Sequence, residues 1–139
     1  MATAAPSATG RVIQITGPVV DIEFPAGALP SIFNAVEIIR EGQEPLTCEV
    51  QQHLGNNWVR AVAMTTTDGL ARGTAVRDTG AAITVPVGDV TKGHVWNTLG
   101  IPLDVPESSL DIKERWSIHR QPPAFDQLES KTQMFETGI

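Results

Sequence analysis

Apolar and more polar residues alternate along the first eighty residues of the chain, and glycine or proline interrupts the runs. In one run Val20, Ile22 and Phe24 alternate with Val19, Asp21 and Glu23. A period of two residues is typical of a strand with one buried face. The same reasoning predicts further strands near residues 13–16, 36–38, 46–54, 58–64, 74–78 and 82–85. Ile13 and Ile15 supply the apolar positions of the first of these.

The clearest hairpin lies between residues 46 and 64. Gly55, Asn56 and Asn57 stand between its two runs, and these residue types tolerate the positive φ that tight hairpin turns require. On the first strand one face is predicted to carry Leu46, Cys48, Val50, Gln52 and Leu54. On the second strand the alternating positions are Val59, Ala61 and Ala63. This segment predicts two antiparallel neighbours.

Six or so short strands within about 70 residues predict an all-β fold, either a small closed β-barrel or a sandwich. Closure is favoured, because an open six-stranded sheet leaves two edges free to aggregate. We therefore expect a flexible tail over residues 1–9 and a six-stranded closed barrel over residues 10–83. So small a barrel buries little apolar surface and gains stability by packing against neighbours.

Residues 84–139 have a different character. Residues 93–99 are compatible with one or two helical turns, and residues 101–115 are polar and rich in turns. Residues 116–120 are expected to be extended, and only residues 126–136 have a helix-forming composition. The segment offers too few apolar residues for a core of its own. It therefore resembles the incomplete, largely irregular beginning of a second domain.

Composition and charge narrow the classes of function. The chain has 139 residues, 41% of them hydrophobic and 19% charged, with a formal net charge of −6. That charge argues against nucleic acid as a partner, because binding phosphates requires a basic surface. No apolar stretch is long enough to span a membrane. The N-terminal residues lack the features of a secretory or organellar targeting signal, which predicts a cytoplasmic protein.

Candidate catalytic and metal-binding residues do not combine into a site. The single cysteine, Cys48, lies in a strand pattern and is interpreted as a small buried hydrophobe, with His53 on the opposite face. His53, His94 and His119 lie in separate segments without the spacing of metal ligands, which favours structural or surface roles. Asp21 and Glu23 share a strand face and are interpreted as solvated surface.

A phosphate-binding loop is also excluded. Ser130, Lys131 and Thr132 superficially resemble the end of such a motif, but Phe125 and Ser130 stand where its two glycines belong. Residues 85–88 (VPVG) lack the second and third glycines of a dinucleotide-binding loop. We therefore predict no catalytic, cofactor-binding or metal-binding residue in this chain, and no enzymatic activity of the 139 residues alone.

Several segments resemble a known family. These are residues 10–25 (GRVIQITGPVVDIEFP), 67–85 (TDGLARGTAVRDTGAAITV), 86–104 (PVGDVTKGHVWNTLGIPLD) and, most specifically, 116–139 (WSIHRQPPAFDQLESKTQMFETGI). Together they resemble the N-terminal portion of the catalytic β subunit of the rotary F-type ATP synthase. The α subunit of that enzyme differs around residues 118–123 (IHRQPP), so β is preferred. The related V-type, flagellar and secretion ATPases are more distant alternatives.

The resemblance implies a barrel that assembles with α subunits in an alternating hexameric ring, together with the other subunits of the complex. The parent enzyme synthesises ATP from ADP and phosphate, driven by a transmembrane proton gradient. Residues 84–139 would then be the incomplete beginning of its α/β nucleotide-binding domain. Its Mg-ATP/ADP site would follow residue 139, so this portion would hold no cofactor. A bacterial protein of this kind lies peripherally on the cytoplasmic face of the cell membrane and meets the membrane only through the complex.

A second hypothesis stays open, namely a free-standing small barrel that acts as a binding or interaction module. Small barrels often bind oligonucleotides on a strand face through stacked aromatic side chains. The barrel segment offers only Phe24, Phe33 and Trp58 for this, and they do not follow an alternating pattern. The acidic charge also argues against it.

Overall fold

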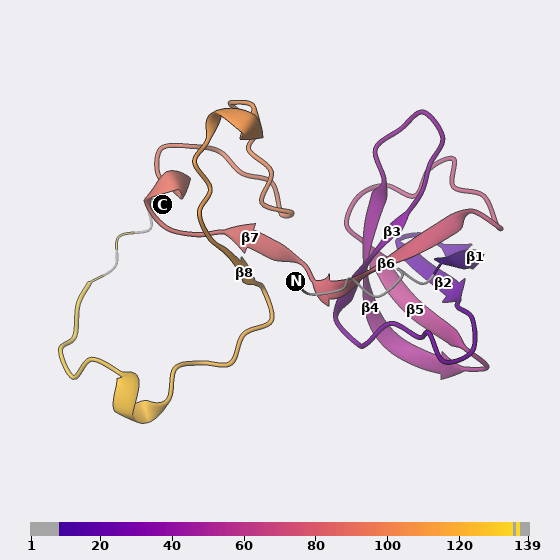
Figure 1. Ribbon diagram of the computed structural model, residues 1–139, viewed down its shortest axis with the longest axis horizontal. Helices are drawn as coiled ribbons and strands as arrows, with labels where there is room; N and C mark the ends of the chain where they lie inside the picture. Colours follow the sequence, from indigo (N-terminus) through magenta and orange to yellow (C-terminus); the bar gives the residue numbers. More distant parts are fainter. Residues whose placement is uncertain (1–8, 135, 137–139) are drawn as a thin grey trace, which may run out of the picture.

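The computed structural model describes residues 9–134 and 136, and its main feature is a closed antiparallel barrel of six strands (Figure 1). The strand order around the barrel is β1-β2-β5-β4-β3-β6, and β6 pairs with β1 to complete the closure. This confirms the predicted all-β, six-stranded barrel. The strands are β1 (Thr9–Thr16), β2 (Val19–Glu23), β3 (Asn34–Ile38), β4 (Leu46–Gly55), β5 (Trp58–Ala63) and β6 (Ala75–Ala82).

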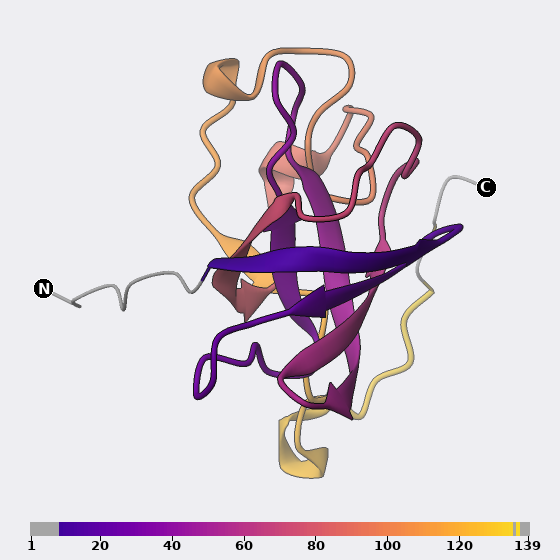
Figure 2. The ribbon, with the colours of Figure 1, turned by 90° about the vertical axis from the view of Figure 1, so that its right-hand side faces the viewer.

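The barrel has no free sheet edge. Viewed from the side of the barrel, β1 and β2 cross in front of the strands of the opposite wall at a steep tilt (Figure 2). Strand tilt of this kind is needed to close a small sheet on itself, and its interior is then just wide enough for side chains. The interior is therefore a packed core.

The predicted hairpin is formed by β4 and β5. Asn56 and Asn57 have φ angles of 51° and 62°, so both central residues of the turn adopt the left-handed conformation that matches the twist of the strands. The pairing brings Cys48 opposite Ala63 and Val50 opposite Ala61. On β5 the predicted alternation is confirmed, since its apolar residues at 59, 61 and 63 are buried.

Thirteen buried side chains from all six strands form one core. Ile22 of β2 and Phe24, which directly follows that strand, lie in it, as the alternation predicted. Gly10 allows the Phe24 ring to lie against β1, because a Cβ atom at Gly10 would come within 2.9 Å of that ring and 2.7 Å of the Glu23 carbonyl oxygen. The core residues are Val12, Val20, Ile22, Phe24, Val36, Ile38, Leu46, Cys48, Val50, Val59, Ala61, Ala63 and Val76.

Irregular pairing changes the facing on two strands. On β1, Ile13 and Ile15 are half-buried and alternate with the exposed Gln14 and Thr16 as predicted, but the register shift between Val12 and Gln14 places Val12 in the core as well. The β4–β5 register shifts after Val50 and again after His53, so Gln52 and Leu54 are exposed and their predicted facing is wrong. A bulge inserts one residue into the pairing and thereby changes which side chains point inward.

The predicted strands at 74–78 and 82–85 do not both belong to the barrel. Residues 75–82 form the single strand β6, and the chain then leaves the barrel at Ile83. Strand β7 (Thr84–Pro86) pairs instead with β8 (Arg115–Ser117) in a separate two-stranded sheet. In Figure 1 this sheet lies beside the barrel, at the start of the extended second part of the chain.

The helical turns compatible with residues 93–99 do not form. Asn97 accepts hydrogen bonds on its side-chain oxygen from the backbone N–H groups of Leu99 and Ile101, which holds this stretch as a turn. Gly100 follows with a φ of 68°, and a Cβ atom there would come within 2.5 Å of Pro86 Cδ. The residue that ends the turn must therefore be glycine.

Residues 126–134 and 136 form no α-helix either; they contribute only to the short 3₁₀ turn η3 (Phe125–Gln127). The side chains from 120 to 134 are exposed, so no buried face supports a longer helix. Further 3₁₀ turns are η1 (Asp89–Thr91) and η2 (Glu107–Ser109). Phe135, residues 137–139 and the predicted tail, apart from Thr9 in β1, lie outside the described residues. Within the described part of the chain, no helix is long and apolar enough to cross a membrane.

Candidate functional site

Ion pairs link neighbouring strands on the outer wall of the barrel. Arg11 of β1 binds Glu23 of β2 at 2.6 Å, and Arg77 of β6 binds Glu37 of β3. In both pairs the two residues lie directly opposite each other in the register. Cross-strand pairs of opposite charge stabilise a particular register. These charged side chains therefore bind one another across neighbouring strands of the barrel.

The most buried of these wall contacts joins Asp21 of β2 to Arg60 of β5. Arg60 Nε and Nη2 donate to the two carboxylate oxygens of Asp21 at 2.8 and 2.9 Å. Asp21 is only 5% exposed. Its hydrogen bond and negative charge raise the pKa of Arg60 above the ordinary value. The interpretation of Asp21 as solvated surface is therefore wrong, because Arg60 covers it, whereas Glu23 lies on the outer wall in an exposed pair with Arg11.

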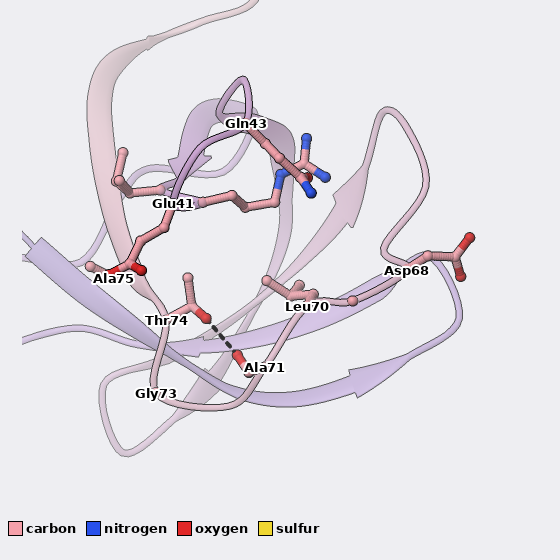
Figure 3. Close-up of a pocket in the computed structure, with 11 residues that line it drawn as sticks. Glu41, Gln43, Asp68, Leu70, Ala71, Gly73, Thr74 and Ala75 are labelled. Carbon is pink, nitrogen blue, oxygen red and sulfur yellow. Dashed lines mark hydrogen bonds between the residues drawn. The ribbon is translucent and has the colours of Figure 1, made fainter.

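One end of the barrel is hollowed between the loop after β3 and the loop before β6. The hollow has a volume of about 560 Å³ and is lined by residues 39–41, 43, 68–71 and 73–75. In Figure 3 Leu70 lies near its middle, whereas the Asp68 carboxylate points away from it. Arg40 Nε and Nη2 donate to the Glu44 carbonyl oxygen at 3.1 and 2.8 Å, so two of the guanidinium donors are bound within the loop that carries Arg40. The hollow therefore lacks the converging polar groups of a substrate site.

The three histidines lie in three different surroundings. His53 Nε2 lies 2.7 Å from the Pro30 carbonyl oxygen, and His94 Nδ1 lies 2.7 Å from an Asp104 carboxylate oxygen. The hydrogen bond from His94 lowers the pKa of Asp104. His119 Nε2 lies 2.8 Å from Oε2 of Glu49, which is on β4. Each histidine thus has a polar partner within the described chain.

Cys48 is fully buried in the barrel core, as predicted. Burial raises the pKa of its thiol to about 12, and the positive charge of Arg40 opposes this rise only in part. A thiol that keeps its proton is a poor nucleophile and a poor metal ligand. Among residues 9–134 and 136, no three histidine, cysteine or acidic side chains are grouped in a way that could hold a metal ion.

The residues that match the end of a phosphate-loop motif do not form an anion site. Ser130, Lys131 and Thr132 are all exposed and lie in irregular chain. No helix begins there, so the converging backbone N–H groups of a phosphate cradle are missing from this stretch. These residues do not fit a nucleotide phosphate.

The segment from β7 to β8 exposes apolar side chains on a scaffold held by polar contacts. Arg115 of β8 binds Glu107 at 3.0 Å, and Trp96 Nε1 donates to the Thr91 carbonyl oxygen at 3.1 Å. Arg120 lies over the Trp116 ring, 3.5 Å from its centre. Exposed apolar side chains gathered in one segment are a common feature of interaction surfaces. The exposed ones here are Val95, Ile101, Leu103, Trp116 and Ile118.

A comparison with known families now adds to this geometry. Residues 12–80 match the model of the ATP synthase alpha/beta family, beta-barrel domain. The closed barrel runs from β1 to β6, over residues 9–82, and so contains the matched residues. Over these residues the chain is similar to the β-barrel domain of the ATP synthase alpha/beta family. The match supports the family resemblance of the sequence for the barrel, at the level that α and β subunits share.

Sequence reasoning missed the contact between His119 and Glu49. The two residues are 70 positions apart, and neither lies in a pattern that indicates pairing. The one available signal was the position of His119 within the IHRQPP segment that distinguishes the resemblance to β from that to α. Contacts of this kind depend on how the chain returns to the barrel, which periodicity does not encode.

Proposed function

We propose that this chain is the N-terminal portion of the β subunit of a rotary F-type ATP synthase, and that its barrel serves assembly of the alternating ring with α subunits. The observation that carries the proposal is the family match of the closed barrel over residues 12–80. The IHRQPP segment at residues 118–123 supports β over α. The barrel contributes a rigid body in which three ion pairs link neighbouring strands.

The proposal places the chemistry of the parent enzyme elsewhere. Synthesis of ATP from ADP and phosphate needs a cradle for phosphate groups and a magnesium ion. Residues 130–132 do not fit such a cradle, and Cys48 is buried with its proton held. We therefore expect Mg-ATP and ADP to bind to parts of the parent subunit other than these residues.

The same proposal sets the location and the role in ion transport. As part of the complex, the chain would lie on the cytoplasmic face of a bacterial cell membrane and contact the membrane only through other subunits. Proton movement would take place in those subunits and reach this chain as a mechanical rearrangement of its neighbours. Fractionation of native cells tests this: the protein should sediment with membranes and be released when the peripheral complex is detached.

Binding to separated subunits tests the assembly role. The purified chain is mixed with α subunits or with β subunits, and the mass of the species is measured by size-exclusion chromatography with light scattering. A mixed species with α but not with β is expected. An Ile22→Asp chain, whose barrel core is disrupted, serves as the matched control and should not bind. Separate elution of the folded chain and α would contradict the proposal, and binding to β alone would indicate an α-type portion.

Two further measurements test where the chemistry lies. The isolated chain should not hydrolyse ATP above the background of a coupled assay, and measurable hydrolysis would contradict the placement of the active site outside it. The protein isolated from its own cells should have an intact mass well above the 14.9 kDa of these 139 residues. A native species of 14.9 kDa and nothing longer would contradict the parent-subunit proposal.

A further inference from the structure

The segment after β7 makes little contact with the barrel. Within residues 84–134, only Pro86, Gly100 and Pro102 are buried. Strands β7 and β8 pair with each other and with no barrel strand. Among the described residues, the side-chain hydrogen bond between this segment and the six barrel strands is the one from His119 to Glu49. The orientation of the segment therefore depends on very few groups.

His119 is held on the barrel by two different interactions. Its Nε2 lies 2.8 Å from Glu49 Oε2, and its ring stacks on the Phe33 ring with the centres 4.2 Å apart and the planes 22° apart. Glu49 is 7% exposed, and its other oxygen accepts a hydrogen bond from Gln51 at 2.5 Å. A buried carboxylate needs such partners, because desolvation disfavours its charge. His119 is therefore placed by a rigid, mostly buried acceptor.

Phe33 adopts a backbone conformation that is unfavourable for its residue type. Its φ is 72°, in the left-handed region where a bulky side chain is strained and glycine is not. Its N–H donates to the Val50 carbonyl oxygen at 2.8 Å, which holds the strained turn against β4. The Phe33 side chain is still 44% exposed, so burial in the core does not explain why phenylalanine stands at this strained position. Local strain of this kind is often found where a side chain has a positioning role.

We infer that Phe33, Glu49 and His119 form a docking cluster that fixes the orientation of the β7–β8 sheet relative to the barrel. The strained turn directs the Phe33 ring outward, and Glu49 supplies the acceptor beside it. The chain on the far side of the cluster is anchored as well, because Ile118 N–H donates to the Ile83 carbonyl oxygen at 3.0 Å and Arg120 stacks on Trp116. The cluster makes the barrel and the following segment one rigid unit, independently of what the whole protein does.

Residual dipolar couplings measured by NMR test the orientation directly. In the unaltered chain one alignment tensor should fit the amides of both the barrel and the β7–β8 sheet. In the His119→Ala and Phe33→Gly variants the sheet should need a tensor of its own, while the barrel amides keep the original fit. A single tensor in both variants would overturn the inference. A need for two independent tensors in the unaltered chain would also overturn it.

Amide hydrogen exchange of Ile118 supplies the second readout. Loss of the ring stack should speed its exchange by roughly three- to tenfold in Phe33→Gly, and by at least as much in His119→Ala, which also loses the hydrogen bond to Glu49. The Phe33→Gly, His119→Ala double variant should exchange no faster than His119→Ala alone, since that single variant already removes the ring stack. Effects that multiply in the double variant would overturn the inference.

Matched variants separate docking from general destabilisation. Ile32→Gly removes an exposed apolar side chain next to Phe33 and also inserts a glycine, but it leaves the stack intact, so Ile118 exchange should be unchanged. His119→Phe keeps the stack and loses the hydrogen bond to Glu49, and it should fall between the unaltered chain and His119→Ala. Barrel amides such as that of Ile22 should be protected equally in all variants. Equal acceleration of barrel and Ile118 amides would show a stability effect alone and overturn the docking role.

Discussion

The buried thiol of Cys48 predicts how the stability of the barrel depends on alkaline pH. The thiol is fully buried, and burial raises its pKa from the ordinary 9.0 to about 12. In the unfolded chain the thiol loses its proton near the ordinary value, whereas in the barrel it keeps it. Ionisation of the thiol therefore stabilises the unfolded chain but not the barrel. The part of the free energy of unfolding that depends on this thiol is complete below about pH 9 and is lost between about pH 9 and 12.

The size of the effect follows from the two pKa values. Each unit of difference corresponds to about 1.4 kcal/mol, so the full loss is about 4 kcal/mol above pH 12. At about pH 10.5, which is practical for measurement, the loss is about 2 kcal/mol. Few other groups obscure it, because the chain has no tyrosine and its three lysines are Lys92, Lys113 and Lys131. Cys48 is thus the main buried group to titrate in this range.

Urea unfolding at a series of pH values measures the effect, with Cys48→Ala as the matched control. The alanine variant starts from a lower stability because it leaves a small cavity, but its free energy of unfolding should fall less steeply between about pH 8 and 10.5. The difference between the two slopes isolates the thiol. Parallel curves would refute the reasoning, and so would rapid reaction of the folded chain with a thiol reagent near pH 8, because a buried, protonated thiol is inert.

Three substitutions test the packing of the barrel and of the turn beside it. Gly10→Ala places a Cβ atom 2.7 Å from the Glu23 carbonyl oxygen and should lower the free energy of unfolding by about 1–3 kcal/mol in urea titrations, whereas an unchanged midpoint would contradict the close contact. Ile22→Asp should abolish the cooperative thermal transition in circular dichroism, because an unpaired buried carboxylate costs several kcal/mol; normal melting would mean that Ile22 faces outward. Gly100→Ala meets Pro86 Cδ at 2.5 Å at a φ of 68°, so hydrogen exchange should speed up in β7 and β8 and stay the same in the barrel. Equal exchange in β7 and β8 of both chains would contradict that contact.

The β4–β5 hairpin shows why much of the barrel could be predicted. Its turn residues Asn56 and Asn57 specify their own positive φ angles, and the alternation on β5 follows directly from the pleat of a strand. Both signals are local, so neither needs knowledge of distant chain. Val20 and Ile22 of β2 were placed in the core for the same reason.

Predictions failed where a distant partner decides the outcome. Whether Val12 or Ile13 points inward depends on the register shift against β2, and the exposure of Gln52 depends on the shift against β5. Asp21 looked like a surface residue because its cover, Arg60, comes from a strand 39 positions later. The docking cluster has the same origin, since Glu49 and His119 meet only when the chain returns past the barrel after β8.

The amino-acid sequence by itself determined the all-β class, the turns and most of the apolar positions that fill the barrel. These properties follow from local conformational preferences and from a period of two residues, which any stretch of chain carries within itself. Only the tertiary structure decided that β6 is a single strand, that β7 leaves the barrel to pair with β8, and that His119 lies on Glu49 and Phe33. Those outcomes depend on free energies shared between segments far apart in the chain, and a pattern read along one segment does not contain them.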